Sequence, residues 1–209
     1  QQSLALAEKG NVTFERLTKR VVLADALHQA GQMGEAETLF REAEALQKER
    51  ESDYPLLYSV QGFLYCDLLQ GQGKYQNVRD RVARALEWIE QVGQGSLLDV
   101  AVDHLSLGRA HLAETRRDET RNFSTAAEHL DQAVDGLRQA GMQAYISRGL
   151  LARAALYRVR REFEPARRDL DEALSIAERG QMGLYRADAH LESARLDLAM
   201  ANKPEAREH

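Results

Sequence analysis

Small and apolar residues recur along the chain at spacings of three and four, which is the spacing of one face of an α-helix. In residues 23–46, LADALHQAGQMGEAETLFREAEAL, the residues Ala36, Phe40 and Ala43 follow this spacing. Gly31, with Gly34 shortly after it, falls where one helix must end and the next begin. The pattern therefore predicts a unit of helix, short turn and helix.

The same frame fits four more times along the chain, so the sequence predicts a repeat of five units. Each unit has one small residue in its first helix; its second helix has a small residue, a bulky residue four positions later and another small residue three positions after that. The small residue of the first helix is Ala24, Cys66, Gly108, Ala154 or Ala194. The second helix opens the pattern with Ala36, Val78, Ala126, Ala166 or Ala206. The bulky residues are Phe40, Val82, Leu130 and Leu170, and the last small residues are Ala43, Ala85, Ala133 and Ala173.

Small residues at fixed places indicate close packing of helices, because a large side chain there would push a helix pair apart. One helix pair buries only one face, so several pairs must stack to form a continuous core. We expect one domain over residues 1–209, with repeats at 12–50, 54–92, 97–140, 144–180 and 184–209 and turns near 31, 73, 161 and 201. SLALAEKG at 3–10 matches ALSIAERG at 173–180, so we interpret residues 1–10 as the end of a truncated repeat and the chain as a fragment.

The frame resembles the tetratricopeptide repeat, whose second helix carries the pattern seen in Ala36-Glu-Thr-Leu-Phe40-Arg-Glu-Ala43. The resemblance implies an all-α fold, a right-handed α-solenoid of stacked antiparallel helix pairs. The small residues that open each second helix recur at intervals of 42, 48, 40 and 40 residues, longer than the usual period of about 34. Such long repeats are similar to the arms of bacterial multidomain signal-transduction ATPases. The first-position Trp of the consensus is missing, and the lone Trp88 is expected to pack or to lie on the surface.

Composition bears on three questions: whether the chain binds nucleic acid, whether it associates with a membrane, and in which compartment it lies. The chain is 44% hydrophobic and 29% charged, with a formal net charge of −5 and both signs interspersed, so no nucleic-acid-binding face is predicted. No stretch is apolar enough to cross a bilayer, so no membrane association is predicted. The single cysteine, Cys66, is consistent with a reducing, cytoplasmic location, and we expect it to be a buried packing residue.

Catalytic and metal-binding motifs are absent from the sequence. There is no phosphate-binding loop, HExxH, CxxC or GxSxG motif, so we expect neither an enzyme nor a cofactor. His104 and His111 could share a helix face, but a zinc site needs a third ligand and none lies at a recognisable spacing. We interpret both as ordinary helix histidines.

The family resemblance also implies a concave groove that binds a protein or peptide. The positions that line this groove in the family hold Val21, Asp25, Phe63, Asp67, Leu105, Arg109, Leu151, Arg158, Leu191 and Arg195. In one interpretation the apolar members only pack long helices together. In the other they supply contact area while the arginines engage carboxylates of a peptide.

The resulting functional hypothesis is a non-catalytic protein-interaction or ligand-sensing domain, the regulatory arm of a larger bacterial signalling protein. Two alternatives stay open: a passive scaffold or adaptor, and a substrate-recruiting arm fused to an enzyme such as a caspase-like protease. Truncated repeats expose apolar surface, so end-to-end self-association is also expected.

Overall fold

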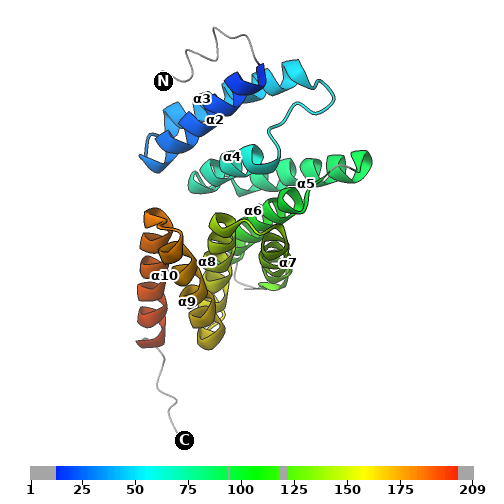
Figure 1. The fold of residues 1–209 in the computed structure, drawn as a ribbon. Helices are drawn as coiled ribbons and strands as arrows, with labels where there is room; N and C mark the ends of the chain where they lie inside the picture. Colours follow the sequence, from blue (N-terminus) through cyan, green and yellow to red (C-terminus); the bar gives the residue numbers. More distant parts are fainter. Residues whose placement is uncertain (1–12, 94, 118–121, 202–209) are drawn as a thin grey trace, which may run out of the picture. The chain divides into compact units, whose positions relative to one another are not determined.

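A computed structural model describes residues 13–93, 95–117 and 122–201 of the 209-residue chain (Figure 1). Within these residues the chain forms nine α-helices and no β-strand, so the predicted all-α class is confirmed. No helix among them combines the length and the apolar character that crossing a membrane requires.

The described helices have the following bounds. The helices are α2 (Thr13–Gln29), α3 (Met33–Arg50), α4 (Ser59–Gly71), α5 (Tyr75–Val92), α6 (Leu97–Thr115), α7 (Ser124–Ala140), α8 (Gln143–Val159), α9 (Phe163–Arg179) and α10 (Gly183–Ala201). The first four repeats each hold two helices and the fifth begins with α10. Residues 1–10 and Ala206 lie outside the described residues, so the truncated first repeat and the last small position stay predictions.

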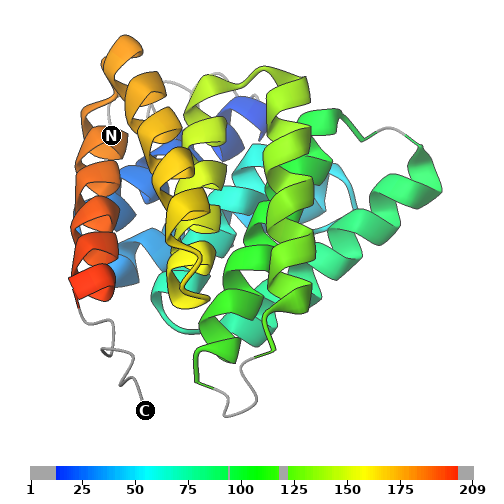
Figure 2. The same ribbon diagram turned by 90° about the horizontal axis from the view of Figure 1, so that it is seen from below.

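The chain divides into two compact units, residues 1–106 and residues 107–209, and the division falls within α6. In the first unit, α4 packs against both α2 and α3, and also against α5. In the second unit, α10 packs against both α8 and α9, and these three helices lie side by side (Figure 2, yellow to red). In each unit, therefore, one helix that opens a pair, α4 or α10, contacts both helices of the preceding pair.

The small positions of the frame lie at helix contacts, as predicted. Among the described residues, each small or bulky position of the frame is buried except Ala194. Gly108 shows the reason most directly, since a Cβ added there would lie 2.6 Å from Cγ of Leu130. No side chain larger than hydrogen fits at that contact unless Leu130 moves.

Four interhelical turns share one backbone hydrogen-bond pattern, which is that of the Schellman motif. The N–H groups of Gln32, Lys74, Glu162 and Met182 donate to the carbonyl oxygens of Leu27, Leu69, Tyr157 and Ala177, at 2.8, 2.9, 2.8 and 2.8 Å. The residue before each donor has a positive φ: 81° at Gly31, 73° at Gly73, 61° at Arg161 and 52° at Gln181. The predicted turns near 31, 73 and 161 are confirmed, whereas the turn predicted near 201 falls at the limit of the described residues.

The segment 51–58, which joins α3 to α4, is held in place by side chains of α3. The N–H of Leu57 donates to Oε1 of Glu44 at 3.1 Å, and Nε2 of Gln47 donates to the carbonyl oxygen of Tyr54 at 3.3 Å. Its backbone also passes close to α4, because a Cβ added at Gly62 would lie 2.5 Å from the carbonyl oxygen of Leu57. The segment therefore has a fixed position beside α3 and α4.

Candidate functional site

The apolar side chains predicted to line a groove differ in exposure. Val21, Phe63 and Leu105 have exposed fractions of 1%, 0% and 0%. Other side chains of the same chain cover them, so these three serve helix packing and offer no surface to a partner. Leu151 is half-buried beside the core of the second unit, whereas Leu191 is 50% exposed.

Three polar residues of the predicted groove, Asp25, Asp67 and Arg109, already interact with other residues of the chain. Oδ1 of Asp25 accepts a hydrogen bond from Gln29 at 3.4 Å. Asp67 on α4 and Arg109 on α6 are half-buried and also have interactions within the chain. Peptide binding by these residues stays a prediction.

Arg158 and Arg195 both bind one buried carboxylate in the second unit. Nε of Arg158 donates to Oε1 of Glu192 at 2.5 Å, and Nη1 of Arg195 donates to Oε2 of the same residue at 3.1 Å. Glu192 is buried. The two arginines thus balance an interior negative charge, which is a structural use of residues predicted to bind a partner.

The first unit contains a polar hollow that the sequence did not predict. Its volume is about 350 Å³, and it is lined by α3, α4, α5, the residue before α5 and the segment 51–58. The lining residues are Glu37, Arg41, Leu56, Tyr65, Leu69, Lys74, Asn77, Asp80, Arg81 and Arg84. We call this the cationic hollow, because four of its side chains are basic and two are acidic.

Helix periodicity explains why these polar residues meet. On α3, Glu37 and Arg41 are four residues apart and therefore share a face. On α5, Asn77, Arg81 and Arg84 are spaced four and three apart and share another face. Side chains from both faces line the same hollow.

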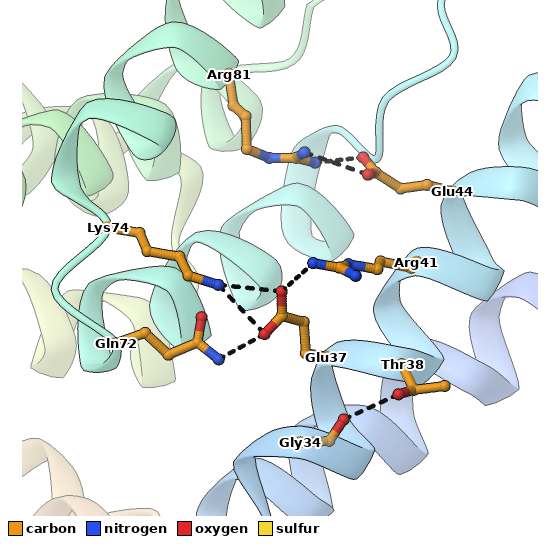
Figure 3. A network of polar contacts seen from close by, with 8 residues as sticks. All are labelled: Gly34, Glu37, Thr38, Arg41, Glu44, Gln72, Lys74 and Arg81. Atoms are coloured by element: carbon orange, nitrogen blue, oxygen red, sulfur yellow. Dashed lines mark hydrogen bonds and ion pairs between the residues drawn. The ribbon is translucent and has the colours of Figure 1, made fainter.

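Glu37 is the centre of a hydrogen-bond network at one end of the hollow (Figure 3). Nζ of Lys74 lies 3.1 and 3.3 Å from its two carboxylate oxygens, Nε2 of Gln72 donates to Oε2 at 2.8 Å, and Arg41 donates to Oε1 at 2.6 Å. The hydrogen bonds from Gln72 and then Lys74 lower the pKa of Glu37. The ionised carboxylate thereby ties the turn between α4 and α5 to α3.

Arg81 lines the hollow and is held in place by contacts with Glu44 and Tyr65. Its guanidinium binds both carboxylate oxygens of Glu44 and lies over the ring of Tyr65, 4.5 Å from the centroid (Figure 3). Tyr65 in turn stacks on Phe40, with ring centroids 4.8 Å apart. Burial opposes the charged form of Arg81, but hydrogen bonds and charge from Glu44 still raise its pKa. The positive charge of Arg81 is therefore paired with Glu44 inside the first unit.

Arg84 leaves a positive charge available at the rim. Its side chain is exposed, and it makes no hydrogen bond or ion pair with the described part of the chain. Arg41 and Lys74 share the carboxylate of Glu37, but their side chains are partly exposed. The hollow therefore favours an anionic ligand, although the chain as a whole is negative.

A second hollow, of about 210 Å³, adjoins the first; its lining contains the aromatic rings of Tyr54 and Trp88 and also the acidic side chains of Asp53 and Glu87. Trp88 of α5 stacks on Tyr54 with ring centroids 4.5 Å apart, and Tyr58 lies 5.0 Å from Trp88. Leu56 and Arg84 line both hollows. The two form one surface, cationic at one end and aromatic at the other, which we call the α5 surface.

Other reactive groups in the described residues have structural roles. Cys66 is buried, as predicted, and burial raises the pKa of its thiol to about 12, so it carries no reactive thiolate. His111 stacks on His129, with ring centroids 5.6 Å apart. In the described ranges no three His, Cys, Asp or Glu side chains come together as a metal site would need.

Two sequence signals for the α5 surface were present but were not recognised. The segment ESDYPLLY, residues 51–58, combines two tyrosines and a proline at the predicted start of the second repeat, and Trp88 lies near the end of that repeat. Trp88 does pack, as expected, but its partners Tyr54 and Tyr58 come from the connecting segment rather than from a neighbouring helix.

Comparison with known proteins adds no assignment: the chain matches no protein-family model, no curated protein and no solved structure. The tetratricopeptide resemblance therefore rests on the residue frame alone.

Proposed function

We propose that this chain is a non-catalytic, tetratricopeptide-like binding module, and that the α5 surface of its first unit holds a peptide segment. The ligand has acidic side chains beside an apolar or aromatic one. Acidic side chains reach Arg84, Lys74 and Arg41, while the apolar residue lies against Trp88 and Tyr54. Arginine beside aromatic rings is a common composition of protein-binding surfaces.

The observation that carries this proposal is the position of Arg84 between the two hollows. It is an exposed cation that lines both the cationic and the aromatic part. The surrounding surface is held in place by the network of Glu37 and by the stack of Arg81, Tyr65 and Phe40. A rigid surface loses little conformational entropy when a ligand binds.

We further propose that the array is a right-handed solenoid and works as the sensor arm of a larger signalling protein. The support is the resemblance of the repeat frame together with the helix-pair contacts seen in each unit. A scaffold or a recruiting arm would use the same surface but would be joined to different domains. A phosphate-binding loop in the flanking sequence favours the sensor arm, whereas a Cys/His protease domain favours the recruiting arm.

The proposal can be tested with Trp88, which is the only tryptophan of the chain. Its fluorescence is followed while a short peptide with glutamates on both sides of one phenylalanine is added. We expect a saturable spectral change, and about tenfold weaker binding for Arg84→Glu because a rim attraction becomes a repulsion.

Arg168→Glu is the matched control, because Arg168 is an exposed arginine of α9 in the other unit. It makes the same charge change and should leave the affinity unaltered. The same peptide with lysine in place of glutamate should not bind. Equal weakening by both variants, or equal binding of both peptides, would contradict the proposed site.

A further inference from the structure

Helix α10 carries an exposed apolar stripe along its whole length. Leu184, Leu191 and Leu198 are seven residues apart and are 51%, 50% and 64% exposed. Alanines lie between and after them at positions 187, 194 and 201, and all three are exposed. The alternation of three and four residues is the heptad pattern of helices that pack along one another.

The opposite face of α10 is already used for packing within the second unit. Ala189, Glu192 and Leu196 are buried there, and Leu196 joins the core cluster with Ala154 of α8. The stripe therefore lies on the side of α10 that faces away from its own unit.

The repeat frame indicates that a helix belongs on this stripe. Ala154 of α8 occupies the same frame position as Ala194 and is fully buried, because Ala166 and Leu170 of α9 pack against it. Ala194 is exposed because no described helix lies on that side of α10. The stripe is thus the face of α10 that corresponds to the face of α8 covered by α9.

We propose that the stripe binds α10 of a second copy of this chain, with the two helices antiparallel about a two-fold axis. In this register Leu191 packs against Ala194 of the second copy, Leu184 against Ala201 and Leu198 against Ala187. Each layer then pairs one large with one small side chain, which allows close approach of the helices. The same face serves both copies, as a two-fold interface requires.

Charges beside the stripe favour this orientation. Asp188 and Arg195 lie along one flank, and His190 and Asp197 along the other. In the antiparallel register Asp188 faces Arg195 of the second copy, and His190 faces Asp197. A parallel pair would instead place His190 beside Arg195, so it lacks these opposite-charge contacts.

The flanking side chains Asp188, Arg195 and Asp197 interact within the chain and are nevertheless exposed. Arg195 binds Glu192 and Asp197 binds Arg167, yet their side chains remain 54% and 62% exposed. Both can therefore contact a second copy without losing these partners. The competing occupant of the stripe is a helix formed by residues after 201, in the same chain or a longer one.

The first experiment measures the mass of the 209-residue chain by analytical ultracentrifugation over a range of concentrations. We expect a reversible dimer that Leu191→Lys converts to a monomer, because lysine would be buried against an alanine. Leu97→Lys is the matched control, since Leu97 is 58% exposed on α6, and it should leave the dimer intact. A monomeric parent chain, or a dimer that survives Leu191→Lys, overturns the proposal.

The second experiment determines orientation by disulfide formation between introduced cysteines. Leu184→Cys chains mixed with Ala201→Cys chains should cross-link across the interface, whereas Leu184→Cys alone should not. The native Cys66 is buried and does not interfere. Cross-linking of Leu184→Cys with itself would show a parallel pair and overturn the antiparallel register.

Discussion

The two units bury carboxyl groups in different ways. In the second unit, Asp169 is buried against the guanidinium of Arg153 at 2.8 and 2.9 Å, and Glu192 binds two arginines. In the first unit, Asp103 is equally buried, but its Oδ2 has no hydrogen-bond partner among the described residues. A paired carboxylate can stay ionised in the interior, whereas an unpaired carboxyl group favours its neutral form.

The lack of a hydrogen-bond partner for Oδ2 of Asp103 is accompanied by a raised pKa. Burial, with a smaller contribution from the charge of Asp99, raises the pKa of Asp103 to about 8. The negative charge of Asp103 raises the pKa values of Tyr54 and Cys66, but burial is the main cause for both. Neither of these two groups titrates between pH 4 and 8, so neither masks a change in the protonation of Asp103 there.

The largest expected effect is on the pH dependence of stability. Between pH 4 and 8 folded Asp103 keeps a proton that the unfolded chain has lost. The free energy of unfolding therefore falls as pH rises, by about 1.4 kcal/mol per pH unit from this group. Asp103→Asn removes that dependence, so the free energy of unfolding of the variant minus that of the parent should grow by about 3.5 kcal/mol between pH 5 and pH 8.

Urea denaturation at the two pH values measures this change. Asp135→Asn is the control, because Asp135 is an exposed aspartate of α7. The free energy of unfolding of Asp135→Asn should differ from that of the parent by nearly the same amount at both pH values. If the Asp103→Asn difference is also constant, Asp103 does not exchange a proton in this range and the contrast between the units fails.

The next effect tests the paired carboxylates of the second unit. Asp169→Ala should lower the free energy of unfolding by about 2 kcal/mol, because the half-buried Arg153 loses its two closest hydrogen bonds. Arg153 keeps its ion pair with Asp131 and its contact with the ring of Tyr157. The comparison variant is Glu42→Ala, which removes the half-exposed partner of Arg20. Glu42→Ala should lower the free energy of unfolding by less than about 1 kcal/mol. Equal losses in thermal or urea denaturation would show that burial does not distinguish the two pairs.

The smallest expected effect concerns the turns, where the units also differ. At the four turns that share the Schellman pattern, glycine adopts the positive φ at 31 and 73 in the first unit, whereas Arg161 and Gln181 adopt it in the second. The turn after α7 in the second unit has a glycine in this conformation, Gly141. A side chain is strained in this conformation, so Arg161→Gly should raise the free energy of unfolding by about 0.5 kcal/mol. Gly73→Ala should lower it by a similar amount, although space around Gly73 is open. A loss of stability in Arg161→Gly would contradict this account of the turn.

Much of the fold could be predicted because helix packing leaves a periodic record in the sequence. Ala36, Phe40 and Ala43 are all buried, and the glycines at 31 and 73 do end helices. Each feature depends on residues within one helix pair, so it can be recognised without knowing the rest of the structure. Ala194 departs from the frame for a reason outside its own helix: no described helix lies on it.

The candidate site was predictable only in part, because it depends on a segment that lies outside the repeat frame. The groove positions came from family geometry, and three of their apolar residues are buried instead. The α5 surface requires Tyr54 to reach Trp88, which depends on how the segment 51–58 is held by Glu44 and Gln47. Such contacts between non-repeating residues have no periodicity to reveal them.

The buried thiol of Cys66 provides a chemical probe for opening of the first unit alone. It is the chain's one cysteine and lies in α4, so a thiol reagent can modify it only after that helix leaves its neighbours. The rate of modification in native buffer therefore reports transient opening of the first unit. Circular dichroism averages over the helices of both units. Comparing unfolding followed by circular dichroism with the rate of thiol modification would show whether the two units open together.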